Sequence, residues 1–203
     1  RISAAKGFRS PTARELYFFP SSNPDLKPER MWNYEIGLSH LFTEWLTLDA
    51  GAFHIDAMEL IRVNTTVFPI TTINTGNVSY NGMELSFRAD IGAGLNLTGS
   101  YSHIFSDEIL VFSPNKLMLS AGYHRKRLGG AVSITRITNL YSGADEAQAV
   151  DDYAVVNLSA RYRVTQHLQF RLNLENLLDT TYETVKGYPM PGRTVMGKVN
   201  IVL

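Results

Sequence analysis

The sequence predicts an all-β protein, namely a segment of an antiparallel transmembrane β-barrel with about ten long strands, short periplasmic turns and long extracellular loops. Three observations predict this fold class. Apolar and polar residues alternate with a period of two, the alternating stretches are long, and the connections between them are alternately short and long. A period of two indicates strands, because successive side chains of a strand point to opposite faces of the sheet.

The clearest alternation lies in residues 168–175. Its two sets are apolar (Leu168, Phe170, Leu172 and Leu174) and polar or charged (Gln169, Arg171, Asn173 and Glu175). A helix would scatter both sets around its circumference, whereas a strand separates them completely. The same pattern predicts strands near residues 1–8, 30–41, 45–61, 79–91, 95–106, 116–126, 130–141, 152–164, 167–181 and 193–203. Arg136 interrupts the alternation in its stretch.

Strand length and loop length together favour a membrane barrel over a soluble sandwich. Most of the stretches contain ~10 residues or more, whereas soluble strands average ~5–6 and strands tilted across a bilayer need ~9–11. Short connections are expected near 42–44, 92–94, 126–129 and 164–167, and long ones at 9–29, 62–78, 107–115, 142–151 and 182–192. Alternation alone fits a sandwich equally well, with the apolar face packed in a core.

In a barrel the polar face lines the lumen, and several strands carry full charges on that face. The residues expected to face the lumen are Arg88, Arg161, Arg163, Arg171, Glu175 and Lys198. They would either guide an anionic ligand or form a solvated inner wall with paired charges.

Composition excludes several other classes. The 203 residues are 44% hydrophobic and 19% charged, which is too apolar for a disordered chain and too lightly charged for a coiled coil. Nineteen basic and nineteen acidic residues cancel, so net charge gives no reason to expect nucleic acid or an anionic membrane surface as partner. The absence of cysteine excludes disulfides, thiolate zinc sites and a cysteine nucleophile.

No apolar run approaches the ~18 residues of a spanning helix, and the chain does not open on a signal peptide. It begins inside a predicted strand and without Met, so we expect a fragment of a longer protein.

Five groups of residues carry a family resemblance that extends from one end of the chain to the other. They are Lys6-Gly7-Phe8-Arg9-Ser10-Pro11-Thr12 with Glu15-Leu16-Tyr17; Asn23-Pro24-Asp25-Leu26-Lys27-Pro28-Glu29 with Asn33-Tyr34-Glu35-Ile36-Gly37; Asn74-Thr75-Gly76 with Tyr80-Asn81-Gly82-Met83-Glu84-Leu85; Glu175-Asn176-Leu177-Leu178-Asp179 with Tyr182; and Gly187-Tyr188-Pro189-Met190-Pro191-Gly192-Arg193. In their order and spacing these segments resemble the carboxy-terminal barrel of TonB-dependent outer-membrane receptors.

The resemblance implies that residues 1–203 are the carboxy-terminal portion of a 22-stranded barrel in the outer membrane of a Gram-negative cell. It implies active uptake of a scarce nutrient such as an iron-siderophore or cobalamin, with the TonB complex and a plug domain outside this chain as partners. The lumen charges are then also candidates for contact with the plug. The last strand would be read by the barrel-assembly machinery, although Leu203 stands where the family usually has an aromatic residue. No cofactor is implied.

The motif residues also have physical roles. Pro11, Pro24 and Pro28 lack an amide donor and belong outside the ladder. Asn176 and Asp179 are expected to bond local backbone where the strand leaves the membrane.

The long loops would form the mouth that first binds ligand. Their candidate binding residues are Arg14, Tyr17, Phe18, Phe19, Phe68, Phe112 and Tyr188. Aromatic rings and guanidinium groups suit flat or ring-bearing ligands through stacking and charge pairing. The alternative for each is an aromatic belt at the membrane interface or packing within the loop. Phe18 and Phe19 are the strongest candidates, since two adjacent aromatic residues in a polar loop are difficult to bury.

Catalytic and metal sites are not expected. None of the five histidines has a ligand spacing such as H-x-x-x-H. Ser102 and His103 are neighbours on a strand, so their side chains would point to opposite faces. Two alternatives remain beside the receptor: a small self-contained outer-membrane channel or surface-binding barrel, and an outer-membrane hydrolase.

Overall fold

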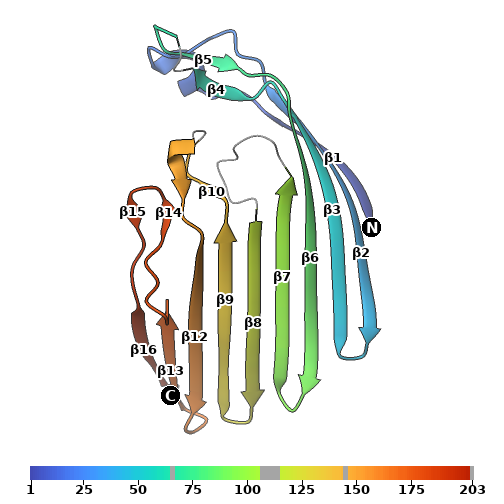
Figure 1. The fold of residues 1–203 in the computed structure, drawn as a ribbon, viewed down its shortest axis with the longest axis vertical. Coiled ribbons are helices and arrows are strands. Elements are labelled where there is room, and N and C mark those ends of the chain that lie inside the picture. The colour runs from blue at the N-terminus through green and yellow to red at the C-terminus, as the bar shows by residue number, and fades with distance from the viewer. Residues whose placement is uncertain (65–66, 106–114, 144–145, 202–203) are drawn as a thin grey trace. The chain divides into compact units, whose positions relative to one another are not determined.

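The computed structural model describes residues 1–64, 67–105, 115–143 and 146–201 (Figure 1). Its main feature is a ten-stranded sheet. The strands, in hydrogen-bonded order, are β1 (Ile2–Arg9), β2 (Glu29–Thr43), β3 (Leu46–Met58), β6 (Val78–Gly92), β7 (Leu95–Phe105), β8 (Asn115–Arg125), β9 (Leu128–Thr138), β12 (Tyr153–Arg163), β13 (Leu168–Glu175) and β16 (Thr194–Ile201). The chain divides into two compact units, residues 1–37 with 52–82 and residues 38–51 with 83–203.

All ten predicted strands are confirmed, and three of them end three or more residues before the predicted boundary. The strand expected over 130–141 ends at Thr138, because Asn139 has a φ of 57°. The strand expected over 45–61 ends at Met58, because Glu59 adopts a left-handed φ of 58° that breaks the ladder. The strand expected over 167–181 ends at Glu175, since Asn176 has a φ of 50°.

The first unit contains the loop ends of four strands and two long connections. β1 and β2 pair antiparallel over the whole of β1, from Ile2 opposite Ile36 to Arg9 opposite Glu29. The connection after β1 contains a five-residue π-helix, η1 (Arg14–Phe18). The connection after β3 contains a small hairpin of β4 (Ile61–Asn64) and β5 (Thr71–Asn74). The sequence pattern predicted both segments only as loops.

In the second unit, short turns and long connections lie at opposite ends of the strands (Figure 1). Four tight turns, at 44–45, 93–94, 126–127 and 164–167, join consecutive strands. Gly94 in one of them has a φ of 88°, which glycine adopts without strain. The long connections form β10 (Leu140–Tyr141) with β11 (Ala149–Val150), the 3-10 helix η2 (Glu146–Gln148), and β14 (Glu183–Val185) with β15 (Tyr188–Pro189).

The described residues leave most apolar side chains of the sheet outside any core. Six hydrophobic residues are buried: Leu26, Ala57, Ala89, Ile137, Val150 and Val155. Phe170 and Leu172, on the apolar face of β13, are 46% and 42% exposed. A soluble sandwich would bury this face, so the observed exposure favours a sheet whose apolar side meets lipid. No helix in the described part of the chain is long and apolar enough to cross a membrane.

Leu172→Arg therefore tests which face meets hydrocarbon. It places a cation on the apolar face of β13, where we expect a loss of ~2–4 kcal/mol in barrel stability near the bilayer midplane. Asn173→Arg is the matched control on the polar face, and we expect it to cost much less. The measurement is urea unfolding of the complete protein in lipid vesicles. Equal losses for the two variants would contradict the assignment of faces.

Candidate functional site

The loop between β1 and β2 is attached to the sheet through Arg9. Its Nε and Nη2 donate to the two carboxylate oxygens of Glu29 at 2.7 and 2.8 Å, and its Nη1 donates to Glu15 at 3.1 Å. Glu15 also accepts hydrogen bonds from the backbone N–H and hydroxyl of Thr12, and Glu29 accepts from the backbone N–H of Ile61. One guanidinium thus joins η1 to β2, and Glu29 joins β2 to the start of β4.

These contacts shift the ionisation of three groups that lie at the loop end of the sheet. The Thr12 backbone N–H, followed by the Thr12 hydroxyl and Arg9, holds the pKa of the Glu15 carboxyl below its usual range. Arg9 and the Ile61 N–H lower the pKa of Glu29 in the same way. The two carboxylates raise the pKa of Arg9. The cluster is therefore fully charged at neutral pH.

Further bonds attach the same loop to the β4–β5 hairpin. The Asn23 Nδ2 donates to the Thr72 carbonyl at 3.0 Å, and the backbone N–H of Thr72 donates to the Ser21 carbonyl. Asn74 exchanges two bonds with the backbone of Lys27, at 2.8 and 3.0 Å. Motif residues of this segment therefore build the loop.

The aromatic candidates in this unit are left exposed by that scaffold. Tyr17 and Phe18 are 67% and 73% exposed, and Phe68 on the hairpin is 97% exposed. Arg14 lies over the Phe19 ring at 4.4 Å from its centroid, so part of this ring is covered. Four predicted residues, Arg14, Tyr17, Phe18 and Phe19, therefore lie in η1 and directly after it. In the second unit Tyr188 is also exposed, and Phe112 lies outside the described residues.

The polar face of the second unit carries a row of three cations. Arg161 on β12 is in register with Arg171 on β13, which is in register with Lys198 on β16. Adjacent strands are ~4.8 Å apart, and like charges directly opposite each other are destabilising. Within the described residues, none of the three forms an ion pair. Arg161 instead donates to Nδ1 of His124 at 2.8 Å, which requires an unprotonated nitrogen.

The other lumen candidates do not join this row. Arg163 lies two residues after Arg161 on the same face of β12, beside the turn, and is in register with Gln169. Arg88 is exposed on β6, and Glu175 pairs with Thr194 at the loop end of β13. On β12, β13 and β16 the polar face is therefore cationic toward the short turns.

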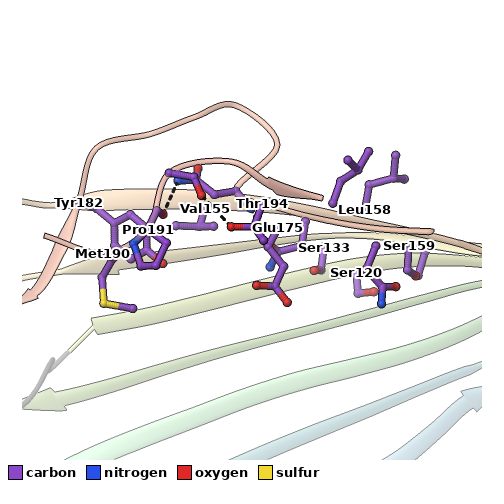
Figure 2. Close-up of a pocket in the computed structure, with 16 residues that line it drawn as sticks. Ser120, Ser133, Val155, Leu158, Ser159, Glu175, Tyr182, Met190, Pro191 and Thr194 are labelled. Atoms are coloured by element: carbon purple, nitrogen blue, oxygen red, sulfur yellow. Dashed lines mark hydrogen bonds between the residues drawn. The ribbon is translucent and has the colours of Figure 1, made fainter. Parts of the chain in front are cut away.

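Toward the loop end, the same unit contains a hollow of about 440 Å³ (Figure 2). Its lining mixes polar and apolar side chains, and the polar ones include Ser120, Ser133 and Asn157, which are in register on β8, β9 and β12. Tyr182, Met190 and Pro191 from the last long connection lie at one end of it in Figure 2. The sequence pattern did not predict this hollow, because its lining comes from five strands whose register the sequence does not reveal.

Asn176 holds that last connection in place. Its side chain accepts from the Thr180 N–H at 2.9 Å and donates to the carbonyls of Thr180 and Pro191 at 2.8 and 3.3 Å. Asp179 accepts from the Arg193 N–H at 2.7 Å. The prediction that Asn176 and Asp179 bond local backbone is confirmed.

The remaining chemical candidates are separated by the strand geometry. The rings of Tyr101, His103 and Phe105 contact one another along one face of β7, so Ser102 points to the other face. His103 is held by Asn115. No group of three or more His, Asp or Glu side chains that could hold a metal ion is found among the described residues.

The comparisons with known proteins agree with this architecture. The family described as "TonB dependent receptor-like, beta-barrel" matches residues 1–177. The vitamin B12 transporter BtuB of Photobacterium profundum is 27% identical over 205 residues, covering 95% of this chain and 33% of the relative. The ferric-pyoverdine 358 receptor of Pseudomonas putida is 25% identical over 189 residues, covering 81% of this chain and 23% of the relative.

Solved structures share the fold. A variant of the ferric enterobactin receptor PfeA from Pseudomonas aeruginosa superposes with a TM-score of 0.82 at 14% identity, covering 98% of this chain and 37% of that one. The copper transporter OprC superposes with a TM-score of 0.78 at 17% identity, covering 98% and 36%. The chain belongs to the TonB-dependent receptor family, whose members are outer-membrane β-barrel proteins, and it spans about a third of the length of the first of these curated relatives.

The Arg9 cluster generates a pH prediction. Glu15 and Glu29 have lowered pKa values in the folded loop, so their stabilising contribution is complete above the ordinary carboxyl pKa of ~4.3. It is lost as the pH falls through the lowered values. We expect hydrogen-exchange protection of the Thr12 and Ile61 amides to fall as the pH is lowered from 7 through the lowered pKa values of Glu15 and Glu29.

The Thr180 amide, whose acceptor is the uncharged Asn176, is the internal control and should keep its protection factor. Glu15→Gln should lower Thr12 protection at pH 7 and remove most of its pH dependence. Protection at Thr12 that does not change with pH in the unsubstituted protein would show that Glu15 does not hold the loop.

Proposed function

We propose that this chain is the carboxy-terminal part of the barrel of an outer-membrane receptor that imports an iron-siderophore or cobalamin. Energy would come from the inner membrane through the TonB complex, and a plug domain outside these residues would fill the lumen. The observation that carries the proposal is a ten-stranded sheet with an exposed apolar face in a chain of this family. Relatives named for vitamin B12 and for ferric pyoverdine support both ligand classes.

The ten strands would form part of a larger barrel. β1 and β16 stand at the two ends of the strand order. Unpaired strand edges in lipid leave backbone groups unsatisfied, at a cost of several kcal/mol for each group. We propose that both edges pair with further strands of the same receptor. The last strand would also be the segment that the barrel-assembly machinery recognises.

The ligand would first contact the exposed aromatic residues of the long loops. Phe18 and Phe19 follow one another at the end of η1, and the Arg9 cluster holds their segment in place. Rings presented on a fixed backbone lose little conformational entropy on binding. Arg14, Tyr17, Phe68, Phe112 and Tyr188 are the other candidates.

The Phe18→Ala/Phe19→Ala double variant tests this proposal. Each exposed ring that stacks on a ligand contributes ~1 kcal/mol, so we expect binding of the transported ligand to weaken by about tenfold or more. The measurement is the Kd of the complete receptor for each ferric siderophore and for cobalamin, by tryptophan fluorescence or calorimetry.

Phe42→Ala is the control, since it removes an exposed ring beside a tight turn of the second unit, away from the long loops. Assembly into the outer membrane should be normal for both proteins. An unchanged Kd in the double variant would reject Phe18 and Phe19 as ligand contacts.

The cationic row would contact the plug. Because Arg161, Arg171 and Lys198 are in register without carboxylate partners among the described residues, acidic side chains on a lumen-filling domain would neutralise them. Arg171→Glu provides an internal partner for both neighbours and repels such acidic groups. We expect a looser plug, measured as a higher single-channel conductance of the complete receptor in planar bilayers.

Arg127→Glu is the control, because Arg127 is an exposed cation in the tight turn at 126–127 and lies outside the row. Equal conductance of Arg171→Glu and the unsubstituted receptor would show that the row of cations does not contact the plug.

The hydrolase alternative receives no support from Ser102 and His103. A hydrolase needs a nucleophile and a base within hydrogen-bond reach, and the side chains of Ser102 and His103 lie on opposite faces of β7. We infer that the chain binds and transports its ligand without chemical change.

A further inference from the structure

A band of aromatic and cationic side chains crosses one face of the first unit. Lys6 and Trp32 are in register on β1 and β2, with the Lys6 Nζ 5.2 Å from the Trp32 ring centroid. Trp32 stacks on Tyr34 at 5.8 Å and 8° between ring planes, and Tyr34 stacks on His54 of β3 at 6.2 Å. We call Lys6, Arg30, Trp32, Tyr34 and His54 the outer band.

The outer band lies on the apolar face of its strands. Lys6, Trp32 and Tyr34 occupy the same face of their strands as Ile2 and Ile36, which are in register with each other. Ile2 is 82% exposed and Ile36 is 59% exposed. The other face of the same two strands is polar, and there Ser3 and Arg1 donate to Glu35. In a barrel the apolar face is the one that meets lipid.

The band lies at the depth of the outer membrane boundary. Trp32 is eleven residues before Thr43, the last residue of β2 beside a tight turn. A strand tilted across a bilayer needs ~9–11 residues, so Trp32 is at the outer limit of the hydrocarbon region. Aromatic girdles occur at this level in outer-membrane barrels, which accounts for the rings but not for the cations.

The two cations of the band have no carboxylate partner in the described part of the chain. Arg30 is in register with Phe8, and Lys6 is over the Trp32 ring. The carboxylate nearest the band along β3, Asp56, is engaged by the Ser79 hydroxyl at 2.6 Å and by Nε2 of His54 at 3.1 Å. Although the whole chain has a net charge of zero, its lipid-facing side therefore carries a local positive surface.

The second unit independently places a cation on an apolar strand face. Arg136, which interrupts the alternation of β9, shares a face with Val132 and Ile134 and is in register with Leu117 and Ala154. It is exposed and is the ninth residue of its strand counted from the tight turn. It is thus a cation on the apolar face at the depth expected for lipid headgroups.

We propose that the outer band binds a phosphate-bearing lipid headgroup of the surrounding outer leaflet. Lys6 and Arg30 contact the phosphate, while Trp32 and Tyr34 pack where acyl chains meet headgroups. Arginine and lysine are the residues that pair with phosphate oxygens, and each cation near an anionic leaflet strengthens its attraction. This inference rests on the outer-membrane placement in the proposed function, but it requires neither a particular ligand nor TonB.

The test is lipid retention by the complete receptor. The receptor is exchanged from vesicles of phosphatidylcholine mixed with a phosphorylated glucosamine lipid, or with phosphatidylglycerol, into mild detergent, and bound lipid is counted by native mass spectrometry. We expect Lys6→Gln/Arg30→Gln to retain about tenfold less of the phosphorylated lipids than the unsubstituted receptor. Phosphatidylcholine retention should not change.

Arg62→Gln/Lys186→Gln removes the same charge from the loops and should retain lipid normally. Lys6→Arg/Arg30→Lys keeps both charges, so we expect it to retain the phosphorylated lipids as the unsubstituted receptor does. That result would show that the loss in Lys6→Gln/Arg30→Gln comes from the missing charges and not from a folding defect. Equal retention by Lys6→Gln/Arg30→Gln and the unsubstituted receptor would overturn the inference, as would displacement of the lipid by millimolar inorganic phosphate alone. A receptor that retains the lipid but imports neither cobalamin nor a siderophore would refute only the proposed function.

Discussion

The rest of this structure depends on one constraint, which is that every backbone polar group inside a bilayer must find a partner within the protein. A ladder of long antiparallel strands satisfies this need and leaves the side chains free to divide between two faces. The division is visible on β13, where Phe170 and Leu172 are exposed on one side and Arg171 and Asn173 lie on the other. A large soluble core is absent from the described residues because the apolar face has lipid as its solvent.

Where the strands leave the membrane, side chains supply the hydrogen bonds to backbone groups that strand pairing supplies elsewhere. Asn176 satisfies three backbone groups of the last connection, and Glu15 and Glu29 accept backbone N–H groups of Thr12 and Ile61. These motif residues determine loop geometry and leave neighbouring aromatic side chains such as Phe18 exposed.

The strands were predictable because their pattern is local, whereas the sites depend on register. A period of two identifies β12 and β13 separately, but only pairing reveals that Arg161, Arg171 and Lys198 form one row. The same holds for Lys6 and Trp32 and for the hollow beside Asn157. The β4–β5 hairpin was missed because its two strands have four residues each, which is too short for the pattern to register. Asn176 was predictable because turn chemistry acts within a few residues.

The most direct test of a sheet with one apolar and one polar face is a cysteine scan of residues 168–175 in the complete receptor. These 203 residues contain no native cysteine, and any cysteine elsewhere in the receptor is first replaced by serine. Each single-cysteine variant, assembled in native outer membranes, is treated with a water-soluble maleimide and with a lipid-soluble one. We expect alternation: the water-soluble reagent labels positions 169, 171, 173 and 175, and the lipid-soluble reagent labels 168, 170, 172 and 174. Uniform labelling, or protection of the even positions from both reagents, would contradict a sheet with lipid on one side and a polar lumen on the other.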